Sequence, residues 1–179
     1  MVRYVSEPPS SGEAQEDADP EQVARTILLR RLTAAPRTRA ELRTDLLRRA
    51  VPEDVADRVI DRFVEVGLID DAAYAQSWVD ARQRTRGTAR SVLRQELRAK
   101  GLDHAHVEEA LAGIDPVAER ERAVRLVEVK ARSTGRLDPQ ARQRRLVSML
   151  QRRGYSAGVA VSVVREVLGE LPEDDIDVR

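Results

Sequence analysis

The sequence predicts an all-α protein built from three tandem three-helix repeats that form an elongated, curved helical scaffold. Three observations predict this fold. Apolar residues recur at spacings of three and four, and no long segment keeps the period of two that a strand requires. Capping acids and glycines stand where helices should start and stop. Finally, one pattern of leucines and basic residues occurs three times along the chain.

The first repeat is predicted over residues 20–69. Its first helix begins at Pro20, because Asp19 before it can accept hydrogen bonds from free backbone N–H groups of the first turn. Thr38 and Glu41 form a capping box that starts the second helix. The third helix has an apolar face formed by Val55, Val59, Phe63 and Val66.

The second repeat is predicted over residues 70–115. Asp70 and Asp71 could be a catalytic or metal-binding carboxylate pair, or one of them could cap a helix. No clear base, nucleophile or metal ligand accompanies them, so we predict the cap, with Leu68 and Ile69 before it pinned to the core. The next apolar positions form a core-facing stripe of Tyr74, Trp78 and Val79.

The third repeat is predicted over residues 116–171. Asp115 and Asp138 each precede a proline, which marks the start of its first two helices. Gly154 is expected to end the second helix in a left-handed conformation. The nine predicted helices span residues 20–33, 39–50, 53–66, 71–85, 88–100, 104–113, 116–132, 139–153 and 157–170.

The repeat itself is visible in the second helix of each unit. Two leucines, a basic residue and a small residue recur at offsets of about fifty positions. The aligned sets are Leu42, Leu93 and Leu146; Leu46, Leu97 and Leu150; Arg49, Lys100 and Arg153; and Ala50, Gly101 and Gly154. Stacked repeats of this kind bind partners along large surfaces more often than they enclose a catalytic pocket.

Charge is segregated along the chain, although the formal net charge is zero. Residues 1–21 carry one arginine against six acids, and residues 170–179 carry one arginine against five acids, so residues 22–169 are strongly basic. We expect residues 1–19 to be an acidic disordered extension and residues 172–179 an acidic tail. A basic body predicts an acidic or phosphate-bearing partner.

The composition also excludes several kinds of site. With no cysteine there is no disulfide or thiolate chemistry. No apolar run is long enough to span a membrane, and no phosphate loop, zinc-protease or serine-hydrolase motif occurs. The only two histidines, His104 and His106, are interpreted as part of a capped helix start. We therefore expect no enzyme activity and no cofactor.

Residues 67–102 carry a more specific signal. The segment GLIDDAAYAQSWVDAR, followed by RGTARSVLRQELRAKGL, closely resembles the RecX family of recombination regulators. The resemblance extends more weakly over about residues 20–170. It implies an all-helical regulator, not an enzyme, that binds the RecA recombinase filament on single-stranded DNA. Such binding would inhibit ATP hydrolysis, strand exchange and cleavage of the SOS repressor, and so modulate DNA repair. We expect a cytoplasmic monomer with no membrane contact.

Basic side chains are the candidate binding residues. The stretch 82–100 holds seven basic residues against one acid, and Arg90, Arg94 and Arg98 should form an exposed row on one helix face. The full predicted set is Arg39, Arg43, Arg82, Arg84, Arg86, Arg90, Arg94, Arg98, Lys100, Arg142, Arg144, Arg145, Arg152 and Arg153. The alternative function is an independent DNA-binding helical repeat, since such rows also fit a phosphate backbone.

Overall fold

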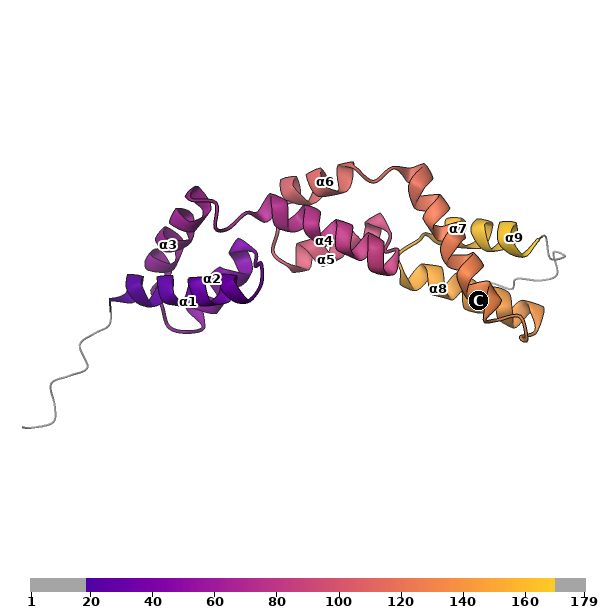
Figure 1. The fold of residues 1–179 in the computed structure, drawn as a ribbon, viewed down its shortest axis with the longest axis horizontal. Coiled ribbons are helices and arrows are strands. Elements are labelled where there is room, and N and C mark those ends of the chain that lie inside the picture. Colours follow the sequence, from indigo (N-terminus) through magenta and orange to yellow (C-terminus); the bar gives the residue numbers. More distant parts are fainter. Residues whose placement is uncertain (1–18, 170–179) are drawn as a thin grey trace, which may run out of the picture. The chain divides into compact units, whose positions relative to one another are not determined.

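The computed structural model describes residues 19–169, and this range forms nine α-helices and no strand (Figure 1). The predicted all-α fold is confirmed. The predicted acidic extension and acidic tail lie outside the described residues, apart from Asp19. The helices are α1 (Pro20–Ala34), α2 (Arg39–Leu47), α3 (Glu53–Glu65), α4 (Asp71–Arg86), α5 (Arg90–Ala99), α6 (His104–Ala112), α7 (Pro116–Arg132), α8 (Pro139–Arg152) and α9 (Ala157–Leu168).

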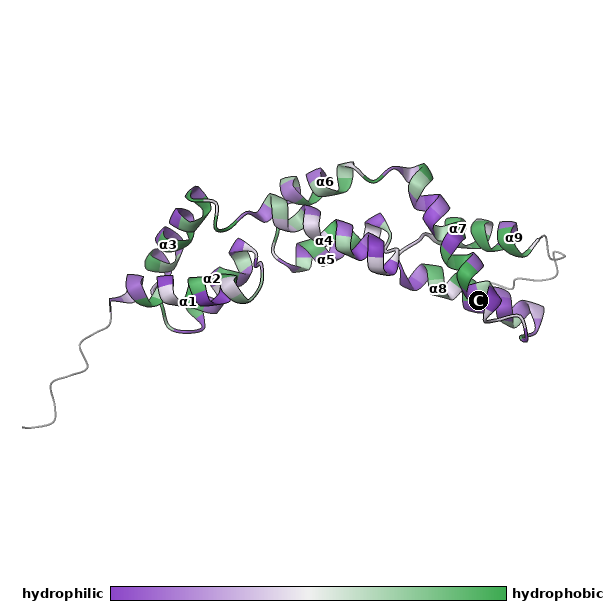
Figure 2. Cartoon of the chain, viewed as in Figure 1, coloured by the Kyte–Doolittle hydropathy of each residue, from purple (hydrophilic) through white to green (hydrophobic). Residues whose placement is uncertain are grey.

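The chain divides into two compact units, one up to Ile69 and the other from Asp70 onward. In the first unit α1, α2 and α3 pack against one another. The second unit holds two such groups, α4 with α5 and α6, and α7 with α8 and α9. Figure 2 shows apolar residues where α7 and α9 face each other. None of the helices in the described range is long and apolar enough to cross a membrane.

Each three-helix group has its own apolar core, and the same aligned positions are buried in all three. This burial is the structural counterpart of the sequence repeat, because equivalent side chains fill equivalent places. The fully buried second-helix leucines are Leu42 and Leu46, Leu93 and Leu97, and Leu146 and Leu150. First-helix positions match as well: Ala24 and Leu28, Ala75 and Val79, and Ala123 and Val127.

A left-handed turn ends the second helix of every repeat. Ala50, Gly101 and Gly154 have φ angles of 59°, 77° and 90°. The next residue in each case is 5% exposed and donates its backbone N–H to the carbonyl five residues earlier, which is the Schellman arrangement. These donors and acceptors are Val51 to Leu46 (3.3 Å), Leu102 to Leu97 (3.3 Å) and Tyr155 to Leu150 (3.2 Å). The turn thereby reverses the chain and buries one apolar residue.

The expected caps are present. Asp70 accepts a hydrogen bond from the backbone N–H of Ala73 at 2.8 Å, so its carboxylate caps α4. Asp103 caps α6 in the same way. One expectation about the segment before α4 is wrong: Ile69 is buried, but Leu68 is 51% exposed. Leu68 follows the left-handed Gly67, and that turn directs only the second apolar residue into the core.

The second and third repeats are docked by their turns. The turn after α4 lies against the turn between α8 and α9. The backbone N–H of Ala89 donates to the carbonyl of Arg153 at 2.9 Å, and the hydroxyl of Tyr155 donates to the carbonyl of Gly87 at 3.0 Å. Because the Tyr155 bond is buried and Ala89 belongs to the third core, this junction is part of the packed interior.

The junction also supplies the missing cap of α5. The residue before this helix, Ala89, has no capping side chain. Instead the carboxylate of Glu119, on α7, accepts from the backbone N–H of Arg90 at 2.6 Å. A carboxylate at a helix N-terminus satisfies a free donor and meets the positive end of the helix dipole. The third repeat therefore completes a helix of the second.

Replacing Gly154 by alanine should destabilise the second unit by about 2 kcal/mol, through backbone strain and overpacking. An added Cβ would lie 2.5 Å from Cγ2 of Val92 and 2.8 Å from Oγ of Ser91. The matched control is Gly113→Ala, because Gly113 has a negative φ of −73° and open space at the Cβ position. Thermal unfolding of both variants measures the difference. Equal melting midpoints would contradict the close approach.

Candidate partner-binding surface

The predicted basic residues divide into those that brace the fold and those that face outward. In the first two repeats, several of the predicted arginines form ion pairs inside their own repeat. Arg43 on α2 binds Asp57 on α3 through two hydrogen bonds of 2.7 and 3.1 Å, and it also pairs with Glu53. Arg39 pairs with Asp61. These side chains hold α2 against α3.

The same bracing occurs at equivalent positions of the second repeat. Arg94 on α5 binds Glu108 on α6 through hydrogen bonds of 2.7 and 3.0 Å, and these two residues align with Arg43 and Asp57 at a common offset of 51. Hydrogen bonding from Arg94 lowers the pKa of Glu108 to about 2. Hydrogen bonding from Arg43 likewise lowers the pKa of Asp57.

A second pair of equivalent bridges joins the first helix of each repeat to its second helix. Arg31 lies 2.9 Å from Asp45, and Arg82 lies 3.0 Å from Glu96. These four residues also align at the offset of 51. Arg82 is among the predicted binding residues, and the sequence pattern of residues 82–100 does not indicate that it pairs with Glu96. The repeat offset was the signal that could have revealed both bridges.

The third repeat replaces these bridges. At the positions of Arg94 and Glu108 it has Val147 and Val161, at an offset of 53. At the position of Glu96 it has Met149, which is buried in the third core. Met149 and Val147 pack in the third core, and the arginines of α8 have no acid at those positions to pair with.

The predicted exposed row on α5 is therefore only partly correct. Arg98 is exposed, but Arg90 and Arg94 are half-buried and both reach Glu108. Their burial follows from the direction of the α5–α6 contact, which the sequence pattern of α5 alone does not specify. Arg90 and Arg94 consequently act as structural residues of this unit.

Trp78 lies at the edge of the second core and not inside it. Its indole N–H donates to Glu96 at 2.7 Å, and the ring stacks on Tyr74 with centroids 6.0 Å apart. The guanidinium of Arg82 lies 4.4 Å from the ring centroid and the ammonium of Lys100 lies 5.0 Å from it, both in cation–π geometry. The core-facing stripe is confirmed for Val79, whereas Tyr74 and Trp78 are only partly buried.

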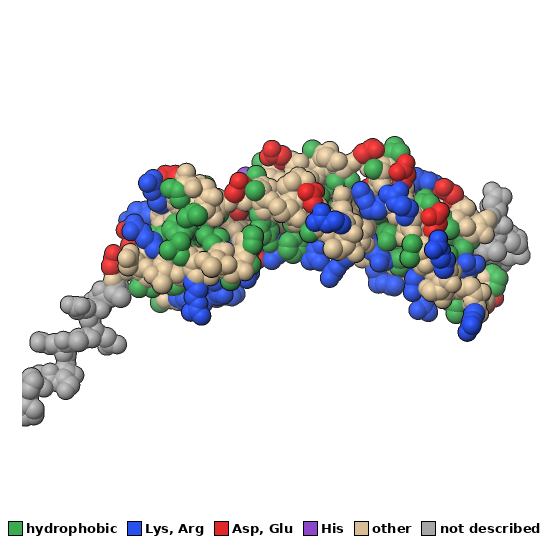
Figure 3. Space-filling view, in the orientation of Figure 1, with side chains coloured by type: hydrophobic (Ala, Val, Ile, Leu, Met, Phe, Trp, Pro, Cys, Tyr) green, Lys and Arg blue, Asp and Glu red, His purple; other side chains and the backbone are tan. Residues whose placement is uncertain are grey.

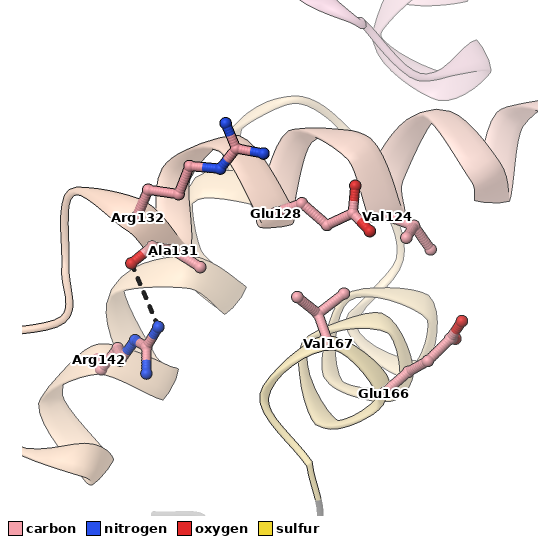
Figure 4. A pocket seen from close by; sticks show the side chains of 7 residues that line it. All are labelled: Val124, Glu128, Ala131, Arg132, Arg142, Glu166 and Val167. Carbon is pink, nitrogen blue, oxygen red and sulfur yellow. Dashed lines mark hydrogen bonds between the residues drawn. The ribbon is translucent and has the colours of Figure 1, made fainter.

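Three predicted arginines near the third repeat bind uncharged oxygens. Arg142 donates to the carbonyl of Ala131 at 3.2 Å (Figure 4). Arg153 donates to the carbonyl of Arg86 at 2.8 Å, which adds a further bond to the junction. Arg152 donates to the hydroxyl of Ser148 one turn earlier, at 2.8 Å, and it remains exposed.

Six predicted residues remain exposed and form no ion pair with any other residue of the range 19–169. We call them the outward arginines. Figure 3 shows Lys and Arg side chains gathered along the lower edge of the second unit, over α5 and α8. Such a surface can bind carboxylates or phosphates. The outward arginines are Arg84, Arg86, Arg98, Arg144, Arg145 and Arg152.

The described residues contain no cluster of His, Asp and Glu side chains that could hold a metal ion. His106 instead lies 2.9 Å from Asp103 within the first turn of α6. Asp70 is occupied as a cap. An open hollow between α7, α8 and α9 is lined by both acids and arginines. A binding surface therefore fits this part of the chain better than an enclosed reaction site.

Family models match all three repeats. The first three-helix domain of RecX matches residues 24–63, the second matches residues 70–111, and the third matches residues 118–164. The chain belongs to the RecX family. The resemblance seen in residues 67–102 is thereby confirmed, and it holds well beyond that segment.

Curated relatives and solved structures agree with this assignment. A "Regulatory protein RecX" from Streptomyces coelicolor is 49% identical over 156 residues, which covers 87% of this chain and 83% of that protein. The one from Thermobifida fusca is 46% identical over 96% of this chain and 90% of that protein. The crystal structure of RecX from Lactobacillus salivarius is 25% identical, with a TM-score of 0.73, and covers 83% of this chain and 97% of that one.

The substitutions Arg94→Ala and Arg98→Ala should differ in their effect on thermal stability, because Arg94 braces α5 against α6 and Arg98 faces outward. We expect Arg94→Ala to lower the melting midpoint by several degrees, because it leaves Glu108 without its main partner. Arg98→Ala should leave the midpoint nearly unchanged, since Arg98 is exposed and forms no ion pair in the described range. Differential scanning calorimetry of the two variants measures this. Equal midpoints would mean that Arg94 is not a brace.

The low pKa of Glu108 predicts a defined pH window. A carboxyl whose pKa falls from 4.5 to about 2 on folding stabilises the folded state above pH 4.5 and loses that contribution as the pH falls through about 2. We expect the melting midpoint of Glu108→Gln to lie below that of the unmodified protein at pH 6. The two midpoints should converge as the pH falls from 4.5 to 2. A constant difference across this range would contradict the assignment.

Proposed function

We propose that this protein binds the RecA filament on single-stranded DNA and inhibits its activities. The inhibited activities would be ATP hydrolysis, strand exchange and stimulated cleavage of the SOS repressor, so that the protein modulates recombination and DNA repair. The observation that carries the proposal is the match of all three repeats to RecX domains, together with relatives named regulatory proteins. Because RecA filaments form on bacterial DNA, a protein that binds them would act in the cytoplasm.

The chemistry of the surface supports this proposal. An inhibitor of a filament has to favour one filament state by binding it more tightly than the other. The outward arginines of α4, α5 and α8 offer charge that is not already neutralised inside the unit. They could contact acidic side chains of neighbouring recombinase subunits. The half-buried braces keep α5 and α6 in a fixed relation, so this face is preorganised for binding.

A second candidate is direct DNA binding without a recombinase. The acid-free sequence of α8 favours it, because four arginines on one helix fit a phosphate backbone. The same helix has no aromatic residue for base stacking. It would therefore contact the phosphate backbone of DNA without a preference for base sequence. Steep salt dependence of DNA affinity, measured with this protein alone, would favour this candidate.

The decisive measurement is ATP hydrolysis by the cognate RecA on single-stranded DNA during titration with this protein. We expect inhibition well below one molecule per recombinase subunit. The triple variant Arg98→Glu, Arg144→Glu and Arg145→Glu should need at least about ten times more protein, which corresponds to about 1.4 kcal/mol of binding free energy.

The matched control is Arg58→Glu with Arg62→Glu. These arginines of α3 are also highly exposed, at 64% and 68%, but they are outside the predicted set. Circular dichroism has to show the same helix content in all variants. Full inhibition by the folded triple variant would show that Arg98, Arg144 and Arg145 do not contact the recombinase. No inhibition by the unmodified protein, even at saturation, would refute the proposed function.

A further inference from the structure

The arginines of α8 are the largest acid-free basic group on a single helix of the described range. α8 contains Arg142, Arg144, Arg145 and Arg152 and no aspartate or glutamate. The second helices of the other repeats, α2 and α5, have intrahelical or cross-helix acids that pair with their arginines. The third repeat has valines and a methionine at the brace positions, so the arginines of α8 form no such pair within the described residues.

The end of α9 lies close to the first of these arginines, Arg142. α9 packs along α8 and runs in the opposite direction, so its last turn lies beside the first turns of α8. Val167 from α9 and Arg142 from α8 line the same open hollow of about 470 Å³, together with Arg132 and two acids, Glu128 and Glu166 (Figure 4). The acids lie on α7 and α9, so Arg142 is the point of this hollow nearest to the other arginines of α8. Gly169, two residues after Val167, is the last described residue.

Arg142 is incompletely satisfied at this hollow. One terminal nitrogen of its guanidinium donates to the carbonyl of Ala131. Its Nε is buried and has no hydrogen-bond partner among the described residues. The guanidinium of Arg142 bonds a neutral carbonyl and no carboxylate of the described residues, so its charge attracts an approaching carboxylate.

The segment that follows Gly169 has the complementary charge. Residues 170–179 read ELPEDDIDVR, with five acids against one arginine. Ten residues reach at most about 33–36 Å when extended. The 14 residues of α8 span about 21 Å, so the segment is long enough to pass along the whole helix.

We propose that the acidic segment 170–179 binds in cis to the arginine face of α8. It would enter past Arg142 at the hollow and pair with Arg144, Arg145 and Arg152 further along the helix. Individual exposed ion pairs are weak, but tethering gives the segment an effective concentration on the order of millimolar. The contact is accordingly sensitive to salt. The segment then competes with any anionic partner of α8, a consequence that rests on the proposed function.

A single spin label tests the contact in the full-length protein without any partner. The chain has no cysteine, so Val178→Cys gives one labelling position. With a nitroxide at position 178, we expect paramagnetic broadening of the amide signals of Arg144, Arg145 and Arg152 in ¹⁵N spectra at low salt. The broadening should decrease at least several-fold in 0.5 M salt, where the Debye length is only about 4 Å.

The matched variant neutralises the five acids in the labelled protein: Glu170→Gln, Glu173→Gln, Asp174→Asn, Asp175→Asn and Asp177→Asn. This variant should abolish the broadening on α8. Replacing Arg144, Arg145 and Arg152 by glutamine should abolish it as well. Replacing Arg58 and Arg62 by glutamine should not, because those residues lie on α3.

Several outcomes would overturn the proposal. Broadening that persists after the acids are neutralised would exclude a charge contact, and broadening confined to the last turn of α9 would exclude docking on α8. Mixing ¹⁵N-labelled protein without a nitroxide and unlabelled protein with one tests the second-copy alternative. Broadening of α8 in this mixture to the same extent would show that the segment binds another molecule instead.

The consequence for regulation has its own readout. If RecA is inhibited, the acid-neutral variant should reach half-maximal inhibition at a several-fold lower concentration than the unmodified protein. If the concentration for half-maximal inhibition is unchanged while the α8 signals are broadened, the segment binds α8 in cis but does not compete with RecA. If neither protein inhibits RecA, the proposed function is refuted. The spin-label experiment would still show whether residues 170–179 bind α8.

Discussion

Every repeat of this protein depends on the left-handed turn that ends its second helix. The turn places one residue at positive φ, and the following apolar residue closes the helix by a bond to the carbonyl five residues back. Because that residue is buried, the third helix is directed back across the first two. Glycine adopts this conformation freely in the second and third repeats, whereas the first repeat holds Ala50 there, where a side chain usually costs about 1 kcal/mol.

The third repeat uses its turn for a second purpose. Gly154 and Tyr155 both close α8. Gly154 also contacts Ser91 in the first turn of α5, and Tyr155 bonds the carbonyl of Gly87, which itself has positive φ. A side chain at Gly87 would lie 2.8 Å from Leu126, and one at Gly154 would lie closer still to Val92. The glycines therefore allow α7 to approach the turn after α4 and α5 to approach the turn after α8, while Ala89 and Arg153 form the backbone bond between the two turns. This explains why the second and third repeats form one compact unit.

Charge has two different uses in the molecule. In the first two repeats, arginine–carboxylate bridges recur at the same positions and join neighbouring helices. The bridges are partly exposed, so each contributes modestly, but together they orient the helices of a repeat. The third repeat has apolar residues at the equivalent positions, and its own bridge joins Arg120 of α7 to Glu166 of α9 at 2.7 Å. Arg144, Arg145 and Arg152 of α8 consequently form no ion pair within the described residues and stay exposed, whereas Arg142 and Arg153 bond backbone carbonyls of neighbouring elements.

The sequence by itself determined the helices, their caps, the repeat and the family. These depend on local spacing and on hydrogen bonds between residues a few positions apart, such as Asp70 with Ala73. It did not determine which arginines are free. Arg94 and Arg98 look alike in sequence, yet only Arg94 faces an acid 14 residues away on α6. The bond from Tyr155 to Gly87 spans 68 residues. Only the tertiary structure decides such contacts, because they depend on how separate helices are packed together.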